Sequence, residues 1–277
     1  MQPHAEINRA DVRSFVSADG PVYQYMSPPD DGQCWSNAHF ADQSVPLADL
    51  RQSPSHPRLA AEGYTLLDAC PPPHLDAETS TDPRRHDEEI ATLVGRCLTG
   101  DIRVFDHQQR EQRGHAGAGG IGRESRSRRP GAVAYAHADY SHASAWRVIG
   151  DAFPDAAEDD RFLILNVWRS GDDPVTAFPL ALCERASVRD ADRVPCTLRY
   201  ADRTGEFQLL RGADHHRWGY FPHLRATEAL VFVSFDSAHG AGAAVFHCAV
   251  ATDPSPDARR RSMESRCVVR LRQWKST

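Results

Sequence analysis

Short apolar runs alternate with breaker residues over the second half of the chain. Each run holds four to seven residues, and Gly, Pro or Asp separates it from the next, as is typical of β-strands joined by turns. The runs occupy residues 162–168, 180–183, 197–200, 206–210, 218–221, 229–233 and 268–271. Because no helical pattern lies between them, they predict an antiparallel barrel or jelly roll and not a parallel α/β sheet.

The first half of the chain predicts two helices. Asp82 and Pro83 provide an N-cap and a first-turn proline. Apolar residues then recur at helical spacing as far as Gly100, at Ile90, Leu93, Val94, Cys97 and Leu98. A second helix is expected from Ser141, with one apolar face made by Ala145, Trp146, Ile149 and Phe153. Residues 1–80 predict an irregular extension with short extended segments at 44–50 and 63–67.

A polar, glycine-rich segment, residues 108–130, is expected to be a mobile loop. It contains G-x-G-x-x-G at Gly117, Gly119 and Gly122, but a dinucleotide site requires a strand before this motif and a helix after it. Here the motif follows a polar segment and precedes Ser- and Arg-rich sequence, so we exclude that site. Two interpretations of the loop remain: a lid over a site near residue 137, or a surface insertion without function.

His137 and Asp139 form the clearest chemical motif. In a strand, residues i and i+2 point to the same side, so both side chains can bind one metal ion while Ala138 faces away. A third ligand has to come from elsewhere, and His247 stands alone in the apolar run 243–250. Two imidazoles and one carboxylate are the set with which non-haem Fe(II) binds a cosubstrate and O2. The alternative is an ordinary polar strand or turn, because H-x-D also occurs by chance.

An arginine-rich run, residues 260–266, follows His247 after a breaker-rich stretch at 252–257. If that stretch forms a hairpin turn, residues 247 and 260 lie opposite each other on adjacent antiparallel strands, and Arg260 faces the metal site. The residues that share its parity are Ser262, Glu264 and Arg266. A guanidinium beside a hydroxyl suits a carboxylate, such as the distal one of 2-oxoglutarate. The alternative is a solvated basic edge.

Other polar and aromatic residues are candidates for the cosubstrate and substrate pockets. Asn166 lies in a strongly apolar run, and a buried Asn needs hydrogen-bond partners. It therefore either helps to hold the cosubstrate or to order the metal ligands, or is satisfied within the core. The aromatic candidates for substrate contact are Tyr135, Tyr140, Trp168, Trp218 and Tyr220, with ordinary packing as the alternative.

Composition limits the class of protein. With 277 residues and 40% hydrophobic content, the chain can bury a core in one domain. A net charge of -6 provides no basic field for nucleic acid or an anionic membrane, so a small-molecule partner is expected. The 7 scattered cysteines lack a C-x-x-C pair, the first residues do not resemble a secretion signal, and no apolar run reaches transmembrane length. These features predict a soluble protein of the reducing cytoplasm.

Several motifs in a fixed order resemble those of one enzyme family. The motifs are residues 104–107, 137–141, 166–169, 179–183, 205–206, 216–218, 235–237, 247 and 260–266. They are similar to those of the bacterial and fungal hydroxylases and desaturases of natural-product pathways, a family that includes the hydroxylase component of cephamycin methoxylation and the fungal gibberellin desaturase. The resemblance covers most of the chain.

The resemblance implies a mainly β fold, a double-stranded β-helix (a cupin-like jelly roll) with flanking helices. Residues 1–277 then form a single domain whose core barrel is residues 131–272. The implied ligands of Fe(II) are His137, Asp139 and His247. The candidates for holding 2-oxoglutarate are Arg260, Ser262, Arg266 and Asn166. Two departures from the family, Cys248 in place of a threonine and Arg261 in place of a glutamate, remove no proposed ligand.

The implied activity is the oxidation of an unactivated C–H bond in a small secondary-metabolite intermediate, with Fe(II), 2-oxoglutarate and O2. Hydroxylation, desaturation and ring formation are the outcomes left open. One alternative is a cupin-type dioxygenase that binds its substrate directly to the metal, although such enzymes prefer histidine-rich ligand sets and Asp139 counts against it. The other is a barrel that binds a small molecule without turnover.

Overall fold

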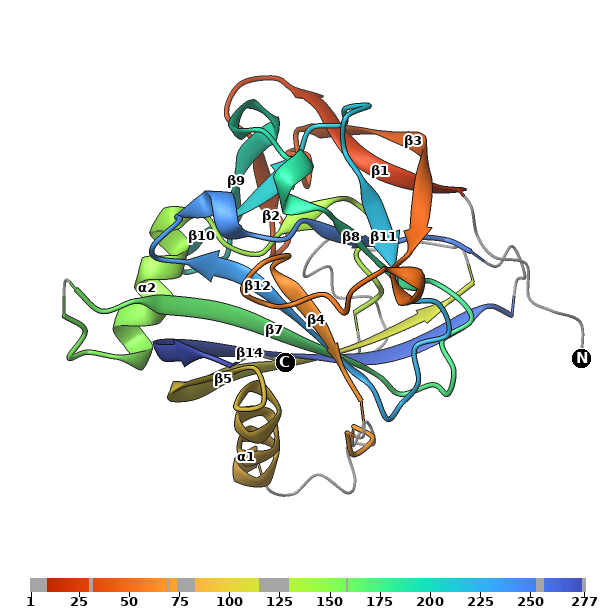
Figure 1. The fold of residues 1–277 in the computed structure, drawn as a ribbon. Helices are drawn as coiled ribbons and strands as arrows, with labels where there is room; N and C mark the ends of the chain where they lie inside the picture. The colour runs from red at the N-terminus through yellow and green to blue at the C-terminus, as the bar shows by residue number, and fades with distance from the viewer. Residues whose placement is uncertain are drawn as a thin grey trace, which may run out of the picture.

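Two β-sheets face each other in the computed structural model of the chain (Figure 1). The structure describes residues 9–29, 32–68, 70–73, 83–114, 130–157, 159–252 and 257–275. Within these residues, the nine-stranded sheet holds, in spatial order, β1 (Arg9–Ala18), β3 (Ala38–Asp49), β11 (Trp218–Tyr220), β8 (Leu180–Cys183), β13 (His247–Ala249), β6 (His137–Ala138), β10 (Thr204–Leu210), β9 (Arg193–Arg199) and β2 (Tyr23–Tyr25). The five-stranded sheet holds β4 (Tyr64–Leu67), β12 (Ala229–Asp236), β7 (Phe162–Ser170), β14 (Arg259–Trp274) and β5 (Leu98–Arg113).

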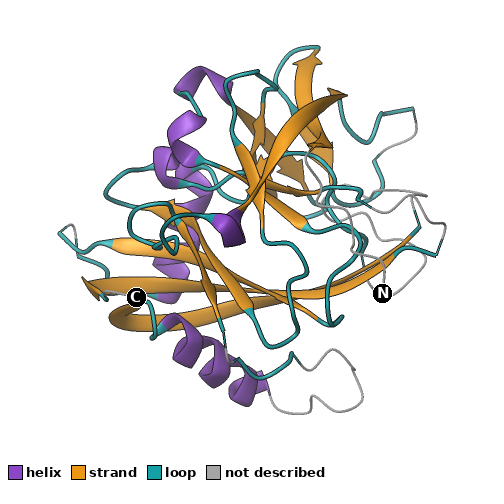
Figure 2. Ribbon diagram, turned by 45° about the vertical axis from the view of Figure 1, so that its right-hand side comes forward, coloured by secondary structure: helices purple, strands orange, loops and turns teal. Residues whose placement is uncertain are grey.

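The strand pairing confirms the predicted jelly roll. Neighbouring strands are antiparallel except for the pairs β3 with β11 and β2 with β9, which are parallel. All of the apolar runs noted in the second half of the sequence lie in strands, and β8 has the predicted bounds. Two α-helices, α1 (Pro83–Val94) and α2 (His142–Ala152), lie outside the sheets (Figure 2). Short 3-10 turns occupy Leu50–Gln52, Arg185–Ser187, Asp190–Asp192 and Ala241–Ala243.

The prediction that residues 1–80 are mostly irregular is wrong for the part that the structure describes, although the expected extended segments at 44–50 and 63–67 lie largely in β3 and β4. β1 and β3 form a long antiparallel pair in which Ala10 lies opposite Val45, and β2 and β4 also belong to the two sheets. The burial of β1 alternates between exposed and buried positions over most of its length, because only one face contacts the core. Half of each such strand is polar, so its composition resembles that of a loop.

The two helices differ in how well their ends were predicted. α2 begins after Ser141, as expected, because the Ser141 hydroxyl accepts a hydrogen bond from the backbone N–H of Ser144 at 3.3 Å. α1 ends at Val94 and not at Gly100, because Leu98 already starts β5. Asp82, its predicted cap, lies outside the described residues.

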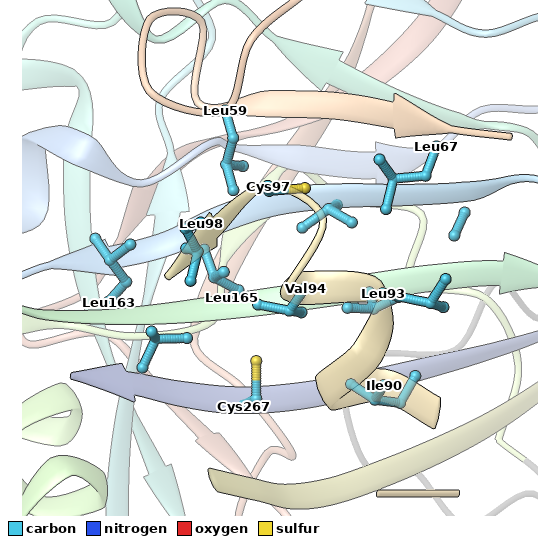
Figure 3. Close-up of a cluster of buried hydrophobic side chains, with 14 of the residues drawn as sticks. Leu59, Leu67, Ile90, Leu93, Val94, Cys97, Leu98, Leu163, Leu165 and Cys267 are labelled. Atoms are coloured by element: carbon cyan, nitrogen blue, oxygen red, sulfur yellow. The ribbon is translucent and has the colours of Figure 1, made fainter. Parts of the chain in front are cut away.

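A buried hydrophobic cluster joins α1 to the outer face of the five-stranded sheet (Figure 3). Ile90, Leu93 and Val94 of the helix pack on side chains such as Leu165 and Cys267 from two central strands. Residues at the alternate positions of these two strands point to the other face of the sheet, toward the nine-stranded sheet. The five-stranded sheet is therefore buried on both sides, which explains why β7 is buried at every position.

A buried polar layer lies beside this cluster, between α1 and the same face of the sheet. His107 of β5 contacts the Ser265 hydroxyl at 2.8 Å and Asp87 at 2.9 Å. Arg169, which has no exposed surface, donates to Glu89. β14 therefore meets this polar layer through its odd-numbered residues near position 265.

A β-bulge in β5 changes which residues face the interior. Val104 lies opposite Cys267, whereas Asp106 lies opposite Arg266, so Phe105 is left without a partner across the strands. Even-numbered positions of β5 point to the outer face before the bulge and to the inner face after it. Arg110, opposite Ser262, consequently belongs to the inner face.

The segment expected to be a mobile loop, residues 108–130, starts as a strand. Residues 108–113 belong to β5 and pair with β14. Residues 115–129 lie outside the described residues. Among the helices of the described residues, none has the length and apolar character needed to cross a membrane.

Two glycines provide a test of the packing. A Cβ at Gly100 would lie 2.4 Å from the backbone oxygen of Arg270, whereas a Cβ at Gly150 in α2 would meet nothing within 4 Å. We expect Gly100→Ala to lower the free energy of unfolding by about 1–3 kcal/mol, because rigid backbone has to shift. Gly150→Ala, the matched control, should raise it by up to about 1 kcal/mol through helix propensity. Denaturant unfolding measures both, and equal effects of the same sign would contradict this packing.

Candidate metal centre

Cross-strand pairing brings the two histidines together. His137 in β6 and His247 in β13 are direct partners across adjacent antiparallel strands, and their ring centroids lie 4.4 Å apart. Asp139 follows β6, and its Oδ1 lies 3.5 Å from His137 Nε2. One potential ligand atom from each residue lies within 4.8 Å of the others. The structure therefore gathers the two imidazoles and the carboxylate that the sequence suggested.

Backbone carbonyls orient both imidazoles in the same way. His137 Nδ1 lies 2.9 Å from the carbonyl oxygen of Tyr135, and His247 Nδ1 lies 3.1 Å from that of Val245. A carbonyl oxygen can only accept, so Nδ1 carries the proton in each ring and Nε2 keeps its lone pair. In metal-binding histidines, a hydrogen bond from the ring nitrogen that does not bind the metal usually fixes the tautomer.

Burial keeps His137 neutral. Desolvation, reinforced by the neighbouring His247, lowers the pKa of His137 to about 3. The ring is 4% exposed, so its lone pair faces the interior and not bulk water. A neutral imidazole is the form that binds a metal ion.

The Asp139 carboxylate is held through one oxygen. Its Oδ2 accepts a hydrogen bond from Asn166 Nδ2 at 2.7 Å and one from Arg266 Nε at 3.0 Å. Burial alone would raise the pKa of Asp139, but Arg266, the two histidines and Asn166 outweigh it and hold this pKa well below its usual range. The carboxylate is therefore charged, and its Oδ1 remains directed at His137.

The guanidinium of Arg266 donates its hydrogen bonds to carboxylates. Besides Asp139, its guanidinium donates to Asp106 and to Glu264. These acids raise the pKa of Arg266 against the effect of burial. We expected Arg266 to bind the cosubstrate, but the structure directs it to the metal-ligand carboxylate.

Asn166 orders the same carboxylate. The hydroxyl of Ser234 donates to Asn166 Oδ1 at 2.8 Å, which turns the Nδ2 of that amide toward Asp139. Asn166 has no exposed surface, and both ends of its amide are used. Of the two alternatives left open by the sequence, the contacts match the ordering of a ligand. Ser234 lies next to a second β-bulge, in β12, and sequence reasoning missed it.

Arg260 and Ser262 are buried with polar atoms that lack partners. They are 2% and 1% exposed, and both Arg260 Nε and Ser262 Oγ lack a hydrogen-bond partner among the described residues. Arg260 donates once, from Nη1 to the carbonyl oxygen of Phe178 at 2.6 Å, and its guanidinium stacks 5.4 Å from the ring centroid of Trp168. Burial lowers the pKa of Arg260 to about 10, so it is still a cation at neutral pH.

The predicted hairpin between His247 and Arg260 is wrong. β13 pairs with β6 and β8 in the nine-stranded sheet, whereas β14 pairs with β5 and β7 in the five-stranded sheet. The chain crosses from one sheet to the other between these strands, so His247 and Arg260 meet across the interior and not side by side. They still line one cavity of about 20 Å³.

Other residues complete that cavity. Its walls also include Arg110, Val133, His137, Trp168, Leu180, Ala249 and Glu264. The volume is about that of one water molecule. Sequence reasoning missed Arg110, because it had assigned residues 108–130 to a loop. Only the bulge in β5 turns this side chain inward.

The aromatic candidates separate into two groups. Trp168 lines the cavity, and Tyr135 packs 5.7 Å from the ring of His137, with its hydroxyl donating to Gln24. Tyr140 lies near Asp139 and Arg266, and its burial raises the pKa of the phenol. Trp218 and Tyr220 are wrong as pocket residues. They pack in a hydrophobic cluster with side chains of β1 and β3, on the face of the nine-stranded sheet that points away from His247.

The two departures from the family pattern lie away from the cavity. Cys248 is buried in the same cluster as Trp218, on the far side of β13 from His247. Arg261 faces Asp172, at 3.4 Å. Neither side chain lines the cavity.

A second cluster of two histidines and an aspartate lies elsewhere among the described residues. Asp192 Oδ2 accepts a hydrogen bond from the backbone N–H of Arg189 at 2.9 Å, and it contacts Nε2 of His215 at 2.8 Å and of His216 at 3.1 Å. These three contacts satisfy the oxygen and link a turn before β9 to the segment before β11. We therefore treat this cluster as structural.

Comparisons with known proteins agree with this geometry. A family described as an oxidoreductase/YMDC permease-like domain matches residues 13–270. The chain is 25% identical, over 275 residues, to the Fe(II)/2-oxoglutarate-dependent dioxygenase nvfI of Aspergillus novofumigatus, covering 92% of this chain and 94% of that protein. It is 30% identical to the hydroxylase/desaturase CTB9 of Cercospora beticola, over 49% of this chain and 46% of that one.

The fold is also similar to solved structures. A variant of the iron and alpha-ketoglutarate-dependent endoperoxidase NvfI superimposes with a TM-score of 0.82 at 19% identity, covering 98% of this chain and 99% of that one. Another structure of that endoperoxidase gives a TM-score of 0.80 at 19% identity, over 95% and 97% of the two chains.

The Asp192 cluster predicts an acid-dependent stability term. Burial opposes ionisation, but hydrogen bonds from Arg189, His215 and His216 outweigh it and lower the pKa of Asp192 to about 2. The stabilisation is complete above the unfolded pKa of about 4 and is lost as pH falls toward 2. We expect Asp192→Asn to cost about 1–3 kcal/mol at pH 7, and the difference from the natural chain to shrink below pH 4.

Denaturant unfolding at pH 7, 4 and 3 measures this difference. Asp190→Asn is the matched control, because that side chain lies in the same turn and is fully exposed. Its effect should stay below about 0.5 kcal/mol at each pH. A difference for Asp192→Asn that is as large at pH 3 as at pH 7 would contradict the assignment.

Proposed function

We propose that this chain, which belongs to the oxidoreductase/YMDC permease-like domain family, is an Fe(II)- and 2-oxoglutarate-dependent oxygenase that acts on a small natural-product intermediate. The observation that carries the proposal is a His/Asp/His triad whose two histidines line one cavity together with Arg260. Two buried polar atoms, Arg260 Nε and Ser262 Oγ, have no hydrogen-bond partner among the described residues. A metal site alone would not explain the second feature.

The triad fits a ferrous ion. His137 Nε2, Asp139 Oδ1 and His247 Nε2 would hold the metal, since each has a free lone pair and a partner on its other polar atom. Two imidazoles and one carboxylate leave positions for further ligands, as non-haem iron oxygenases require. When bound, Fe(II) with 2-oxoglutarate and O2 supplies the oxidising power for attack on an unactivated C–H bond.

The arginine–serine pair fits a carboxylate. Leaving Arg260 Nε and Ser262 Oγ buried without partners is costly, and a carboxylate oxygen can accept from both. Trp168 supports the guanidinium from one side, and the Phe178 carbonyl holds it from the other. We propose that this pair binds the distal carboxylate of 2-oxoglutarate, while the triad faces the other end of the molecule.

The remaining residues position these groups and exclude water. Arg266 and Asn166 keep Asp139 charged and immobile, so its Oδ1 stays directed at the metal position. Val133, Leu180 and Ala249 provide apolar walls that strengthen the electrostatic contacts inside. We propose that residues 1–277 act as one oxygenase domain.

The reaction outcome is proposed at the level of class. Relatives are named a hydroxylase/desaturase and an endoperoxidase, so hydroxylation, desaturation and ring formation are all within the reach of this fold. Reduced cysteines accord with a cytoplasmic location, since all 7 are free.

Metal loading is the first test of this function. Anaerobically purified protein that receives Fe(II), 2-oxoglutarate and air should release succinate. His247→Ala and Asp139→Ala should each reduce succinate formation at least about 100-fold, because a metal ligand is lost. His39→Ala, an exposed histidine of β3, is the control and should keep both metal and activity. Fe(II) content should fall in parallel, and a His247→Ala protein that retains metal and turnover would refute the triad.

Cosubstrate affinity is the second test. Calorimetric titration of 2-oxoglutarate into anaerobic, Mn(II)-loaded protein should show a dissociation constant about 10- to 100-fold weaker for Arg260→Met and about 5-fold weaker for Ser262→Ala, as expected for lost hydrogen bonds to a charged group. Arg261→Met is the matched control, because that guanidinium points at Asp172. An unchanged affinity in Arg260→Met would assign the carboxylate to another residue.

A further inference from the structure

Arg110 adds a second cation to the cavity. It comes from β5, the edge strand of the five-stranded sheet, and lies opposite Ser262. Its side chain lines the same cavity as His137, His247 and Arg260. The cavity therefore contains two guanidinium groups beside the candidate metal position.

Arg110 has no carboxylate partner within the described part of the chain. Among the described residues, it donates a hydrogen bond from Nη1 to the carbonyl oxygen of Gly131 at 3.0 Å. Two other inward-facing or buried arginines nearby do have acid partners: Arg266 contacts Asp139, and Arg169 donates to Glu89. Arg110 is half-buried, and the charges of Glu264 and Asp139 act on it without a direct ion pair. A cation that is largely removed from water and has no directly bonded carboxylate is costly, and an added anion would lower that cost.

The two cations also repel each other. Burial lowers the pKa of Arg110, and after burial the charge of Arg110 is the largest cause that lowers the pKa of Arg260. An anion near Arg110 would relieve this repulsion. Arg110 therefore offers donors to a negative group on the side of the cavity that it lines.

Bound metal and cosubstrate would not neutralise the positive charge of Arg110. The charges of Fe(II) and of the 2-oxoglutarate dianion cancel each other. One carboxylate of the cosubstrate is bound by Arg260 and Ser262 in the proposed arrangement. The buried acids Asp139 and Glu264 both contact Arg266. Three guanidinium groups and three carboxylates then surround the loaded site, but all three carboxylates contact Arg266, and none among the described residues forms an ion pair with Arg110. The third acid, Asp106, has a 42% exposed side chain and pairs with Arg266.

We infer that Arg110 binds an acidic group of the primary substrate, a carboxylate. This inference rests on the proposed oxygenase function and deepens it by naming a substrate class. The guanidinium presents a planar pair of donors that suits a carboxylate. Fixed at that point, the substrate places its hydrocarbon part over the open side of the triad, and the position of the acid selects which C–H bond is presented.

A pair of small probes tests the inference. Cyclohexanecarboxylate and its uncharged amide are titrated, by ligand-observed NMR, into full-length protein loaded with Mn(II) and saturated with 2-oxoglutarate without oxygen. The natural chain should bind the carboxylate at least about tenfold more tightly than the amide. Arg110→Met and Arg110→Gln should lose this preference. Arg113→Met, a change at an exposed arginine of the same strand, should keep it.

The 2-oxoglutarate affinity of the same variants distinguishes a role of Arg110 in binding the substrate from a role in binding the cosubstrate. It should change by less than about threefold in Arg110→Met and Arg110→Gln, which also reports that the site is folded. A loss of 2-oxoglutarate affinity as large as in Arg260→Met would make Arg110 part of the cosubstrate pocket and overturn the inference. A natural chain that does not distinguish the two probes, or a variant that keeps the preference, would also overturn it. Absence of 2-oxoglutarate binding by the natural chain would instead refute the proposed function itself.

Discussion

The charged contact between Arg266 and Asp139 is the constraint on which the site depends. Asp139 follows a strand of one sheet, and Arg266 lies in the other, so their bond closes the sandwich at the point where the triad forms. A buried carboxylate would otherwise take up a proton or turn toward water. Because Arg266 and Asn166 engage only Oδ2, the same contact that keeps the charge also aims the remaining oxygen. The Arg266 guanidinium therefore contributes both to the contact between the two sheets and to the orientation of the candidate metal ligand Asp139.

Local sequence was sufficient to identify most of the side chains that the structure gathers at the candidate site, because their relations are short in range. His137 and Asp139 are two residues apart, and strand geometry alone places them on one side. Arg260 and Ser262 are related by the same rule, and their burial follows from it. The order of the apolar runs predicted the jelly roll, since each run is long enough to form a strand but too short for a helix.

Relations between distant segments could not be read in the same way. A single unpaired residue, Phe105, shifts the parity of β5 and turns Arg110 inward, yet nothing in the local pattern marks that position. Trp218 shows the same difficulty, because an aromatic residue on a strand buried on both faces has no preferred side until its neighbours are known. The hairpin proposed after His247 failed since a turn-forming composition does not distinguish a return within one sheet from a crossing to the other.

The two faces of β14 contribute to two different parts of the structure, the cavity and the polar layer under α1. Its even-numbered residues face the interior, where Arg260 and Glu264 line the cavity and Arg266 contacts Asp139, while Ser265 belongs to the polar layer under α1. Loss or gain of one residue between these positions would exchange the two sets, burying a hydroxyl where the cation is needed. This strand can thus diversify during evolution by replacement of side chains but not by change of length.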